Sequence, residues 1–190
     1  DDSSHRVVFQ LHRDDTNQSF WPQNTPLLIS YTLGKSIEIE LITRNDETHP
    51  VTITEALHTY FEVSDIRDIS IVGLDGVTFV DKVDKGARKQ QVGNIGFSGE
   101  TDRVYMDTTG DCVIQDPGYH RSIRVEKRES QSTIIWNPWI EKAASMGDYT
   151  EDGYLRMVCV ESGNAVDNRV TVEPGGEHRL WVRYSTAPLG

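Results

Sequence analysis

One histidine and one glutamate in this chain could transfer protons in a catalysed reaction. His58 lies in the run 54–61, which we expect to be a buried strand, and Glu161 ends the apolar run 156–161. Burial and a neighbouring charge can move the pKa values of an imidazole and a carboxyl group toward neutral pH, where they can act as proton donor and acceptor. Histidines and glutamates in strands are more often hydrogen-bonded structural residues, so the pattern alone leaves both interpretations open.

Rigid elements must hold these two side chains, and the sequence predicts strands almost throughout. Three segments alternate apolar with polar side chains, as half-buried strands do: residues 37–42, 122–127 and 179–184. Shorter β-rich runs bounded by turn residues lie at 6–11, 66–72, 77–83, 103–107, 112–115, 133–136, 155–161 and 169–172. This pattern predicts an all-β fold, with two large antiparallel sheets packed face to face.

Some local patterns are less clear. Residues 55–61 could also form a helix, but the β-branched and aromatic residues around them favour a strand, with Tyr60 and Phe61 in the core. Tyr60 could instead present its hydroxyl to a site beside His58. Residues 143–146 fit one helical turn, and the polar connection 84–93 fits an exposed loop.

Composition limits the class of protein. The 190 residues are 36% hydrophobic and 26% charged, which suits a single domain, residues 1–190, with a substantial core. No apolar run approaches the length of a membrane-spanning helix. The net charge of −11 argues against nucleic acid and acidic membrane surfaces as partners, because both attract basic faces. The oligomeric state stays open.

Two cysteines, Cys112 and Cys159, lie in separate strand-like runs. They form no Cys-x-x-Cys motif and have no histidine at the spacing of zinc ligands, so we expect no metal site. Cys159 has the pattern of a small buried apolar residue. Two unpaired thiols suit a reducing compartment, and we expect a cytoplasmic protein.

Four segments carry a resemblance to a known family. They are Thr-Glu-Ala-Leu-His-Thr-Tyr-Phe at 54–61, Gly-Glu-Thr-Asp-Arg-Val-Tyr at 99–105, Trp-Asn-Pro-Trp-Ile-Glu-Lys-Ala at 136–143 and Met-Val-Cys-Val-Glu at 157–161. In this order they resemble the hexose-6-phosphate mutarotases (glucose-6-phosphate 1-epimerases) of the aldose 1-epimerase superfamily. The resemblance implies a galactose mutarotase-like β-sandwich. It covers the C-terminal two-thirds of such proteins, and the N-terminal segments whose arginines help form the family's sugar-phosphate pocket have no counterpart in these residues.

The resemblance also implies an activity and a set of site residues. Mutarotases interconvert the α and β anomers of a hexose or hexose 6-phosphate, with His58 expected as the acid and Glu161 as the base. Asp102 matches the family's substrate-binding aspartate, although the pattern alone favours a turn residue before a strand. The resemblance implies no metal, nucleotide or redox cofactor.

Other candidates are weaker. Strand alternation points Arg103 to the face opposite Asp102. Trp139 could form a flat wall for a sugar ring, or it could pack a loop while Trp136 lies in the core. Five basic residues could contact a phosphate or could be solvated surface charges: Lys82, Arg88, Lys89, Arg103 and Lys142. A catalytically silent carbohydrate-binding β-sandwich is the alternative function, and a purely structural domain is the third.

Overall fold

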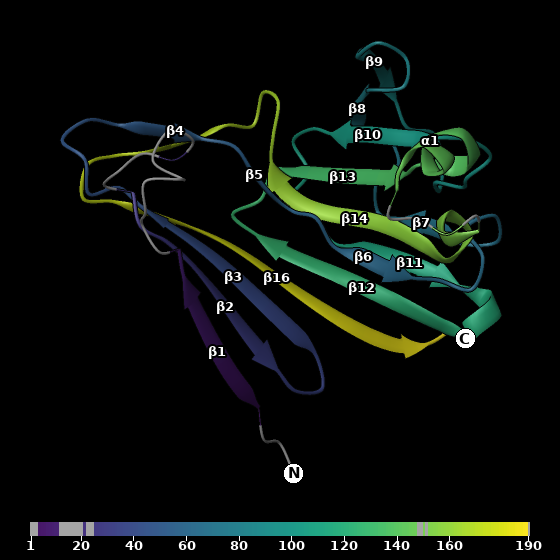
Figure 1. Cartoon of the computed structure of the whole chain (residues 1–190). Helices are drawn as coiled ribbons and strands as arrows, with labels where there is room; N and C mark the ends of the chain where they lie inside the picture. Colours follow the sequence, from purple (N-terminus) through teal and green to yellow (C-terminus); the bar gives the residue numbers. More distant parts are fainter. Residues whose placement is uncertain (1–3, 12–20, 22–24, 148–149, 151, 190) are drawn as a thin grey trace.

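The computed structural model describes residues 4–11, 21, 25–147, 150 and 152–189. Antiparallel strands make up most of it, which confirms the predicted all-β fold (Figure 1). The first sheet has seven strands in the order β1 (His5–Gln10), β2 (Leu27–Leu33), β3 (Ile37–Arg44), β16 (Glu177–Pro188), β12 (Arg121–Arg128), β11 (Cys112–Asp116) and β7 (Ser70–Val72).

The second sheet also has seven strands and lies against part of the first. Its order is β5 (Glu55–Leu57), β14 (Met157–Asn164), β13 (Ser132–Asn137), β10 (Thr101–Tyr105), β8 (Thr78–Asp81) and β9 (Ala87–Gln90), and β6 (Tyr60–Glu62) also pairs with β14. A separate two-stranded sheet joins β4 (Val51–Ile53) to β15 (Val170–Val172). The helices are short: η1 (Pro117–Tyr119), α1 (Trp139–Ser145) and η2 (Gly153–Arg156).

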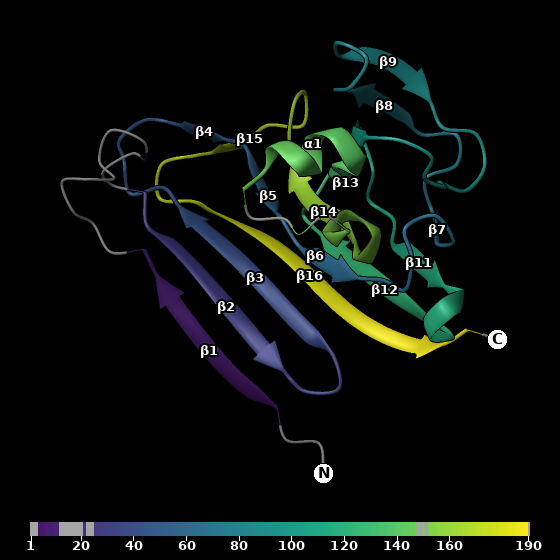
Figure 2. The ribbon, with the colours of Figure 1, turned by 45° about the vertical axis from the view of Figure 1, so that its right-hand side comes forward.

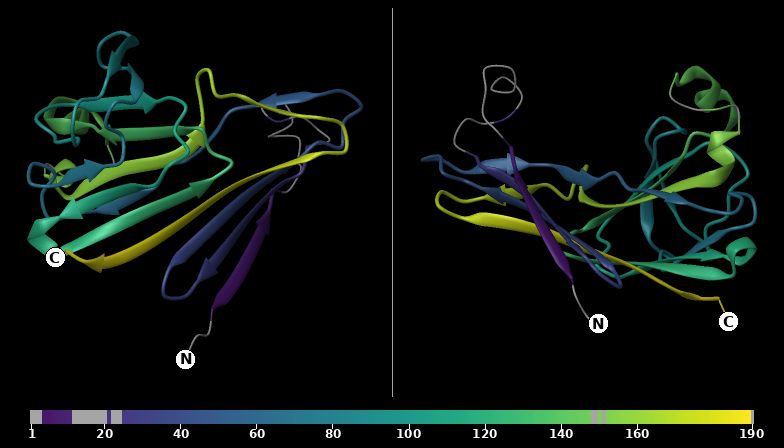
Figure 3. Two further views of the ribbon diagram at one scale, coloured as in Figure 1. Left: turned by 180° about the vertical axis from the view of Figure 1, so that it is seen from behind. Right: turned by 60° about the horizontal axis from the view of Figure 1, so that its bottom comes forward.

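The two large sheets overlap only in part. The second sheet covers the side of the first that contains β16, β12 and β11, while β1 and β2 extend beyond it (Figures 1 and 2). Every residue of β1 is exposed. Seen from behind and from below, α1 lies at the end of the molecule opposite β1 (Figure 3). No helix within the described residues has the length and apolar character to cross a membrane.

The main core lies between the sheets and fixes which side chains face outward. Val158 and Val160 of β14 are fully buried in it, together with Ile135 of β13. Burial of each such side chain contributes about 1.5–3 kcal/mol. Successive side chains of a strand point to opposite faces, so Cys159 and Glu161 of β14 lie on the outer face of the second sheet. The core residues therefore orient the residues that could carry chemistry.

Some predicted elements need correction. The predicted strand 66–72 is confirmed only at its end, because residues 65–68 form a turn in which the Arg67 amide donates to the Asp65 carboxylate at 2.9 Å. Residues 153–156 form η2 rather than the start of a strand. The helix begins at Trp139 and not near residue 143.

Three strands lie outside the predicted ranges: β2, β4 and β9. β9 lies inside the predicted loop 84–93, where it pairs with β8 and remains exposed. The run Leu-Leu-Ile-Ser-Tyr-Thr-Leu forms β2, which pairs with both β1 and β3. The three alternating segments are confirmed as β3, β12 and β16, each with longer bounds than predicted.

Candidate active site

His58 lies at an interruption between two short strands, not inside one continuous strand as predicted. β5 ends at Leu57 and β6 begins at Tyr60, and the Thr59 amide donates to the Leu57 carbonyl at 2.9 Å in the tight turn between them. The Thr59 hydroxyl lies 2.7 Å from the Tyr184 hydroxyl of β16, which ties this turn to the first sheet. The side chain of His58 is 51% exposed. The imidazole is therefore held at a fixed turn with one side open to solvent.

Glu161 lies within β14 and its side chain is only 6% exposed. β5 and β6 both pair with β14, and this pairing brings His58 and Glu161 together across 103 positions of sequence. His58 Nε2 lies 3.4 Å from Glu161 Oε1. The two residues expected to share a substrate thus lie side by side.

The environment of Glu161 changes its protonation. Burial raises the pKa of the Glu161 carboxyl to about 7, and the negative charge of Asp102 contributes in the same direction. Removing a carboxylate from water disfavours its charged form, so a larger fraction stays protonated at neutral pH. A group that titrates near pH 7 can both accept and return a proton under physiological conditions.

Asp102 lies in β10, so its prediction as a turn residue before a strand is wrong. The register sets Asp102 opposite Trp136 of β13, and Trp136 opposite Cys159 of β14. These three residues therefore form a row across the outer face of the sheet. Burial raises the pKa of Asp102 above its ordinary value, and the positive charges of Lys82 and Lys142 oppose that shift.

Aromatic rings flank His58. Tyr60 stacks on the imidazole with 4.9 Å between ring centroids, and Trp136 meets it edge-on at 5.7 Å. Tyr60 is 52% exposed, so its predicted place in the core is wrong, whereas Phe61 is buried as predicted. Trp139 packs beside the main core and contacts Tyr154.

Trp136, rather than Trp139, is thus the tryptophan beside the histidine. It is buried as predicted, but in a small cluster on the outer face with Met157 and Cys159. Asn137 stabilises the backbone between the end of β13 and the start of α1. Its side chain accepts a hydrogen bond from the Trp139 amide and donates to the Met157 carbonyl, both at 2.9 Å.

Cys159 also contacts the histidine, which the sequence spacing did not reveal. Its Sγ lies 3.6 Å from His58 Nδ1, and the residue is fully buried. His58, Cys159 and Glu161 place one nitrogen, one sulfur and one oxygen donor within 4.8 Å of one another. The thiol faces Nδ1 and the carboxylate faces Nε2. Nitrogen, sulfur and oxygen donors of these types bind zinc, so the expected absence of a metal site stays a prediction.

Most of the basic candidates have other roles. Arg88 pairs with Asp167, and Lys89 pairs with Asp81 and Asp84. The Arg103 guanidinium lies 5.0 Å from the centroid of the Phe79 ring, on the face opposite Asp102 as alternation predicts. Lys142 lies 3.4 Å from Glu100, and its charge acts on Asp102 as that of Lys82 does. These two lysines are the basic candidates associated with the site.

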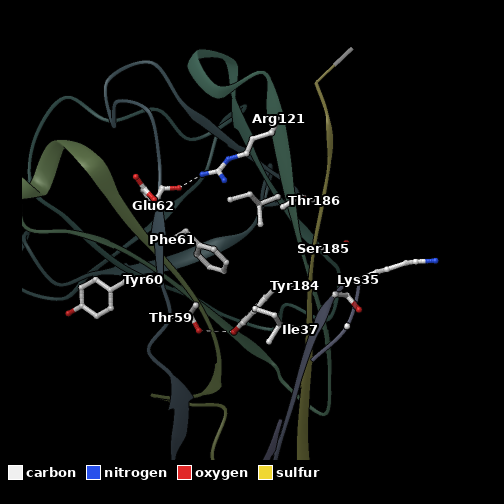
Figure 4. A pocket seen from close by; sticks show the side chains of 13 residues that line it. Lys35, Ile37, Thr59, Tyr60, Phe61, Glu62, Arg121, Tyr184, Ser185 and Thr186 are labelled. Carbon is white, nitrogen blue, oxygen red and sulfur yellow. Dashed lines mark hydrogen bonds between the residues drawn. The ribbon is translucent and has the colours of Figure 1, made fainter. Parts of the chain in front are cut away.

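A pocket of about 360 Å³ adjoins the site between β6 and the first sheet (Figure 4). Its lining includes Tyr60, Phe61 and Tyr184, but not His58, Glu161 or Asp102. The ring of Tyr60 points away from the other labelled side chains of the pocket. Two cations, Lys35 and Arg121, line the pocket, and Arg121 donates to the Glu62 carbonyl at 2.5 Å. The side chains of His58, Glu161 and Asp102 lie outside this pocket, on the other side of Tyr60. We place the candidate active site there.

The antiparallel β-sandwich, with a histidine and a glutamate side by side on its outer face, has the fold of a mutarotase-like protein. The family model described as "Aldose 1-epimerase" matches residues 1–185, and the chain belongs to the aldose 1-epimerase family. The chain is 37% identical over 170 residues to a protein from Escherichia coli (strain K12) named "Putative glucose-6-phosphate 1-epimerase", and 32% identical over 183 residues to a protein of the same name from Cenchrus ciliaris.

A solved structure agrees with this assignment. The crystal structure of "a putative mutarotase" from Salmonella typhimurium matches 99% of this chain with a TM-score of 0.90 and 32% identity. The chain spans only part of each of these proteins: 56% of the Escherichia coli relative, 55% of the Cenchrus ciliaris relative and 62% of the Salmonella typhimurium chain.

Proposed function

We propose that this chain carries the acid–base centre of a mutarotase that interconverts the α and β anomers of an aldohexose or its 6-phosphate. In this proposal His58 is the acid, Glu161 is the base, and Asp102 accepts hydrogen bonds from sugar hydroxyls. The supporting observation is the 3.4 Å approach of His58 Nε2 to a buried carboxyl group whose pKa is about 7. Half of the His58 side chain is exposed and therefore open to a ligand.

The chemistry needs only these two groups. Ionised Glu161 takes the proton of the anomeric hydroxyl, the bond between C1 and the ring oxygen breaks, and the ring oxygen receives a proton from His58 Nε2. The open aldehyde turns about the C1–C2 bond and closes on its other face, while both protons return to their donors. The two oxygens share C1, so the acid and the base must lie side by side. Positioned acid–base groups contribute about 10² to 10⁴ in rate.

The surrounding residues can hold the rest of the sugar. Asp102 lies on the same outer face but one strand beyond β13, at a lateral separation from β14 of about 10 Å. A carboxylate at that distance can contact hydroxyl groups remote from the anomeric centre. The exposed ring of Tyr60 stacks on the imidazole and offers apolar surface to the sugar.

The phosphate is the less supported part of the substrate. Two relatives carry the words glucose-6-phosphate in their names, and the charges of Lys82 and Lys142 make the surroundings of Asp102 less negative. Charge-assisted contacts to a phosphate are strong, so an enzyme that uses them should prefer the phosphorylated sugar.

Measuring the anomer exchange of glucose and of glucose 6-phosphate at equal concentration would decide whether the phosphate is recognised. A preference that disappears in Lys82→Ser or Lys142→Ser would assign the phosphate contact to that lysine.

The main test is anomer exchange measured by NMR above the spontaneous background. We expect His58→Asn and Glu161→Gln each to reduce the rate at least about a hundredfold, because each removes one proton carrier and keeps most of the side-chain shape. Asp102→Asn should weaken sugar binding along with the rate. Circular dichroism would verify that each variant folds.

Two results would contradict the proposal. Retention of most of the exchange rate by His58→Asn would rule out the acid role. A wild-type chain that binds sugar without accelerating exchange would instead be a catalytically silent carbohydrate-binding domain.

A further inference from the structure

The contact between Cys159 and His58 suggests how the imidazole is kept ready to donate a proton. Cys159 and Glu161 lie two positions apart on β14, so their side chains share its outer face. The Cys159 thiol lies 3.6 Å from Nδ1, and a Glu161 oxygen lies 3.4 Å from Nε2. One strand thus presents a different group to each ring nitrogen.

We propose that Cys159 is a positioning residue that holds the neutral His58 imidazole in the tautomer with its proton on Nε2, facing Glu161. This inference rests on the proposed acid role of His58. A neutral imidazole has one nitrogen that donates and one that accepts. An ionised carboxylate only accepts hydrogen bonds, so Glu161 favours the proton on Nε2. Nδ1 is then an acceptor, and the S–H of Cys159 is placed to donate to it.

The opposite tautomer is unfavourable at both nitrogens. It would direct the Nε2 lone pair at the Glu161 carboxylate and leave the S–H without its acceptor. The thiol also stays protonated, because burial raises the pKa of Cys159 well above its usual range and the charge of Glu161 contributes further. A protonated thiol is a weak donor, but a neutral imidazole nitrogen is an available acceptor.

The ring contacts of the two aromatic neighbours do not select a tautomer. Tyr60 stacks on the ring and Trp136 meets it edge-on, and both contacts restrict the plane of the imidazole. Neither contact distinguishes one tautomer from the other by a directed hydrogen bond. The choice between Nδ1–H and Nε2–H therefore depends on the thiol and the carboxylate. The Nε2 proton is the one that the ring oxygen of the sugar would receive. The negative charge that Glu161 loses on taking the anomeric proton then lies on the imidazole, whose Nδ1 accepts from the Cys159 S–H until ring closure returns the proton to Nε2.

The direct test is the tautomeric state of His58 in ¹⁵N-labelled protein, from ¹H–¹⁵N correlation NMR at pH 8 without sugar. At this pH most of Glu161 is ionised, since its pKa is about 7. We expect the Nε2–H tautomer in the wild type and in Cys159→Ser, whose hydroxyl can also donate. Cys159→Ala should raise the population of the Nδ1–H tautomer, with Glu161 still favouring Nε2–H, and lower kcat for anomer exchange by up to about tenfold with little change in KM, the scale of one lost hydrogen bond.

Cys112→Ala is the matched control, because it removes the second buried thiol from β11 in the opposite sheet. It should leave both the tautomer and kcat unchanged. If Cys159→Ala does not fold, Cys159→Val fills the space of the thiol and removes the donor. A wild-type His58 with its proton on Nδ1 would overturn the inference, as would an unchanged tautomer in a folded Cys159→Ala or Cys159→Val. If the wild type shows no anomer exchange, the proposed function fails, while the tautomer measurement still decides the role of Cys159.

Discussion

Two histidine–glutamate pairs lie along β14 and β5, and their surroundings differ sharply. In the first pair, His58 Nε2 and Glu161 Oε1 are 3.4 Å apart, and the histidine is 51% exposed. In the second pair, His178 Nε2 and Glu55 Oε1 are 2.7 Å apart, and the histidine is 10% exposed. Asn164 also donates to the Glu55 carboxylate at 2.9 Å. The second pair is closer, better enclosed and supported by a further hydrogen bond.

The difference separates a structural pair from the pair that we propose to be reactive. His178 of β16 and Glu55 of β5 join the two large sheets, and the hydrogen bond to Glu55 is the main reason that the pKa of His178 is raised. Their opposite charges support each other. In the first pair, burial of Glu161 raises its pKa toward neutrality while its partner stays half in solvent. The half-exposed His58 therefore compensates only part of the cost of burying the Glu161 charge. This destabilises the charged form of Glu161, and it also makes that carboxylate a better proton acceptor.

The largest effect should come from removing each histidine in turn. His178→Ala leaves the buried Glu55 carboxylate without its ion-pair partner, and we expect a loss of about 3–5 kcal/mol in the free energy of unfolding. His58→Ala removes a half-exposed partner and should cost less than about 1 kcal/mol. Urea denaturation at pH 7 measures both. Equal losses would mean that the two pairs do not differ in their structural roles.

The pH dependence of the rate should distinguish the pairs next. Glu161 must be ionised to act as base and its pKa is about 7, so kcat/KM should rise with pH through that value. We expect a loss of roughly fiftyfold on going from pH 7 to pH 5, since only about 1% of such a carboxyl is ionised at pH 5. Exchange NMR with the spontaneous rate subtracted at each pH would show it. A flat profile over this range would exclude Glu161 as the base.

Much of the fold was predictable because its strands alternate regularly. The alternation in β12 even implies the burial of a lysine. Ile123 and Val125 face the core, and Lys127 follows them on the same face. Lys127 is buried there and donates to Thr108 and Thr133. Local patterns failed where the backbone departs from regular structure, as at the interruption that exposes Tyr60 beside His58.

The site was predictable only in part. Family motifs identified His58 and Glu161, and the structure places them in contact. The contact of Cys159 with the imidazole depends on the pairing of β6 with β14, which sets Tyr60 opposite Cys159. Pairing between segments about a hundred residues apart leaves no local signal in one sequence. The second pair, His178 and Glu55, depends in the same way on how the two sheets meet.

Replacing the ionisable Glu161 with a neutral residue should stabilise the protein at alkaline pH. A carboxyl group whose folded pKa is raised from 4.5 to about 7 makes stability fall as pH rises through that interval. Glu161→Gln removes this cost, so at pH 8 we expect it to be more stable than the wild type by about 1–3 kcal/mol. At pH 4.5 the two should be nearly equal, which provides the internal control. A less stable Glu161→Gln at pH 8 would show that the charged Glu161 is compensated in the native state.

The smallest effect should be the pH dependence of the enclosed pair, measured in the Glu161→Gln background so that the titration of Glu161 does not obscure it. The pKa of His178 is raised above 6.5, so its contribution to stability is complete below pH 6.5 and is lost as pH rises through the folded value. We therefore expect the free energy of unfolding to fall between pH 6 and pH 8. The range stops at pH 8 because burial lowers the pKa of Lys127 to about 8, which adds stability above that pH.

An NMR titration of His178 should give a midpoint above 6.5, and adding His178→Gln should remove the slope. A His178 midpoint at or below 6.5 would mean that the Glu55 pair does not favour the charged histidine, and the two pairs would then differ in geometry alone.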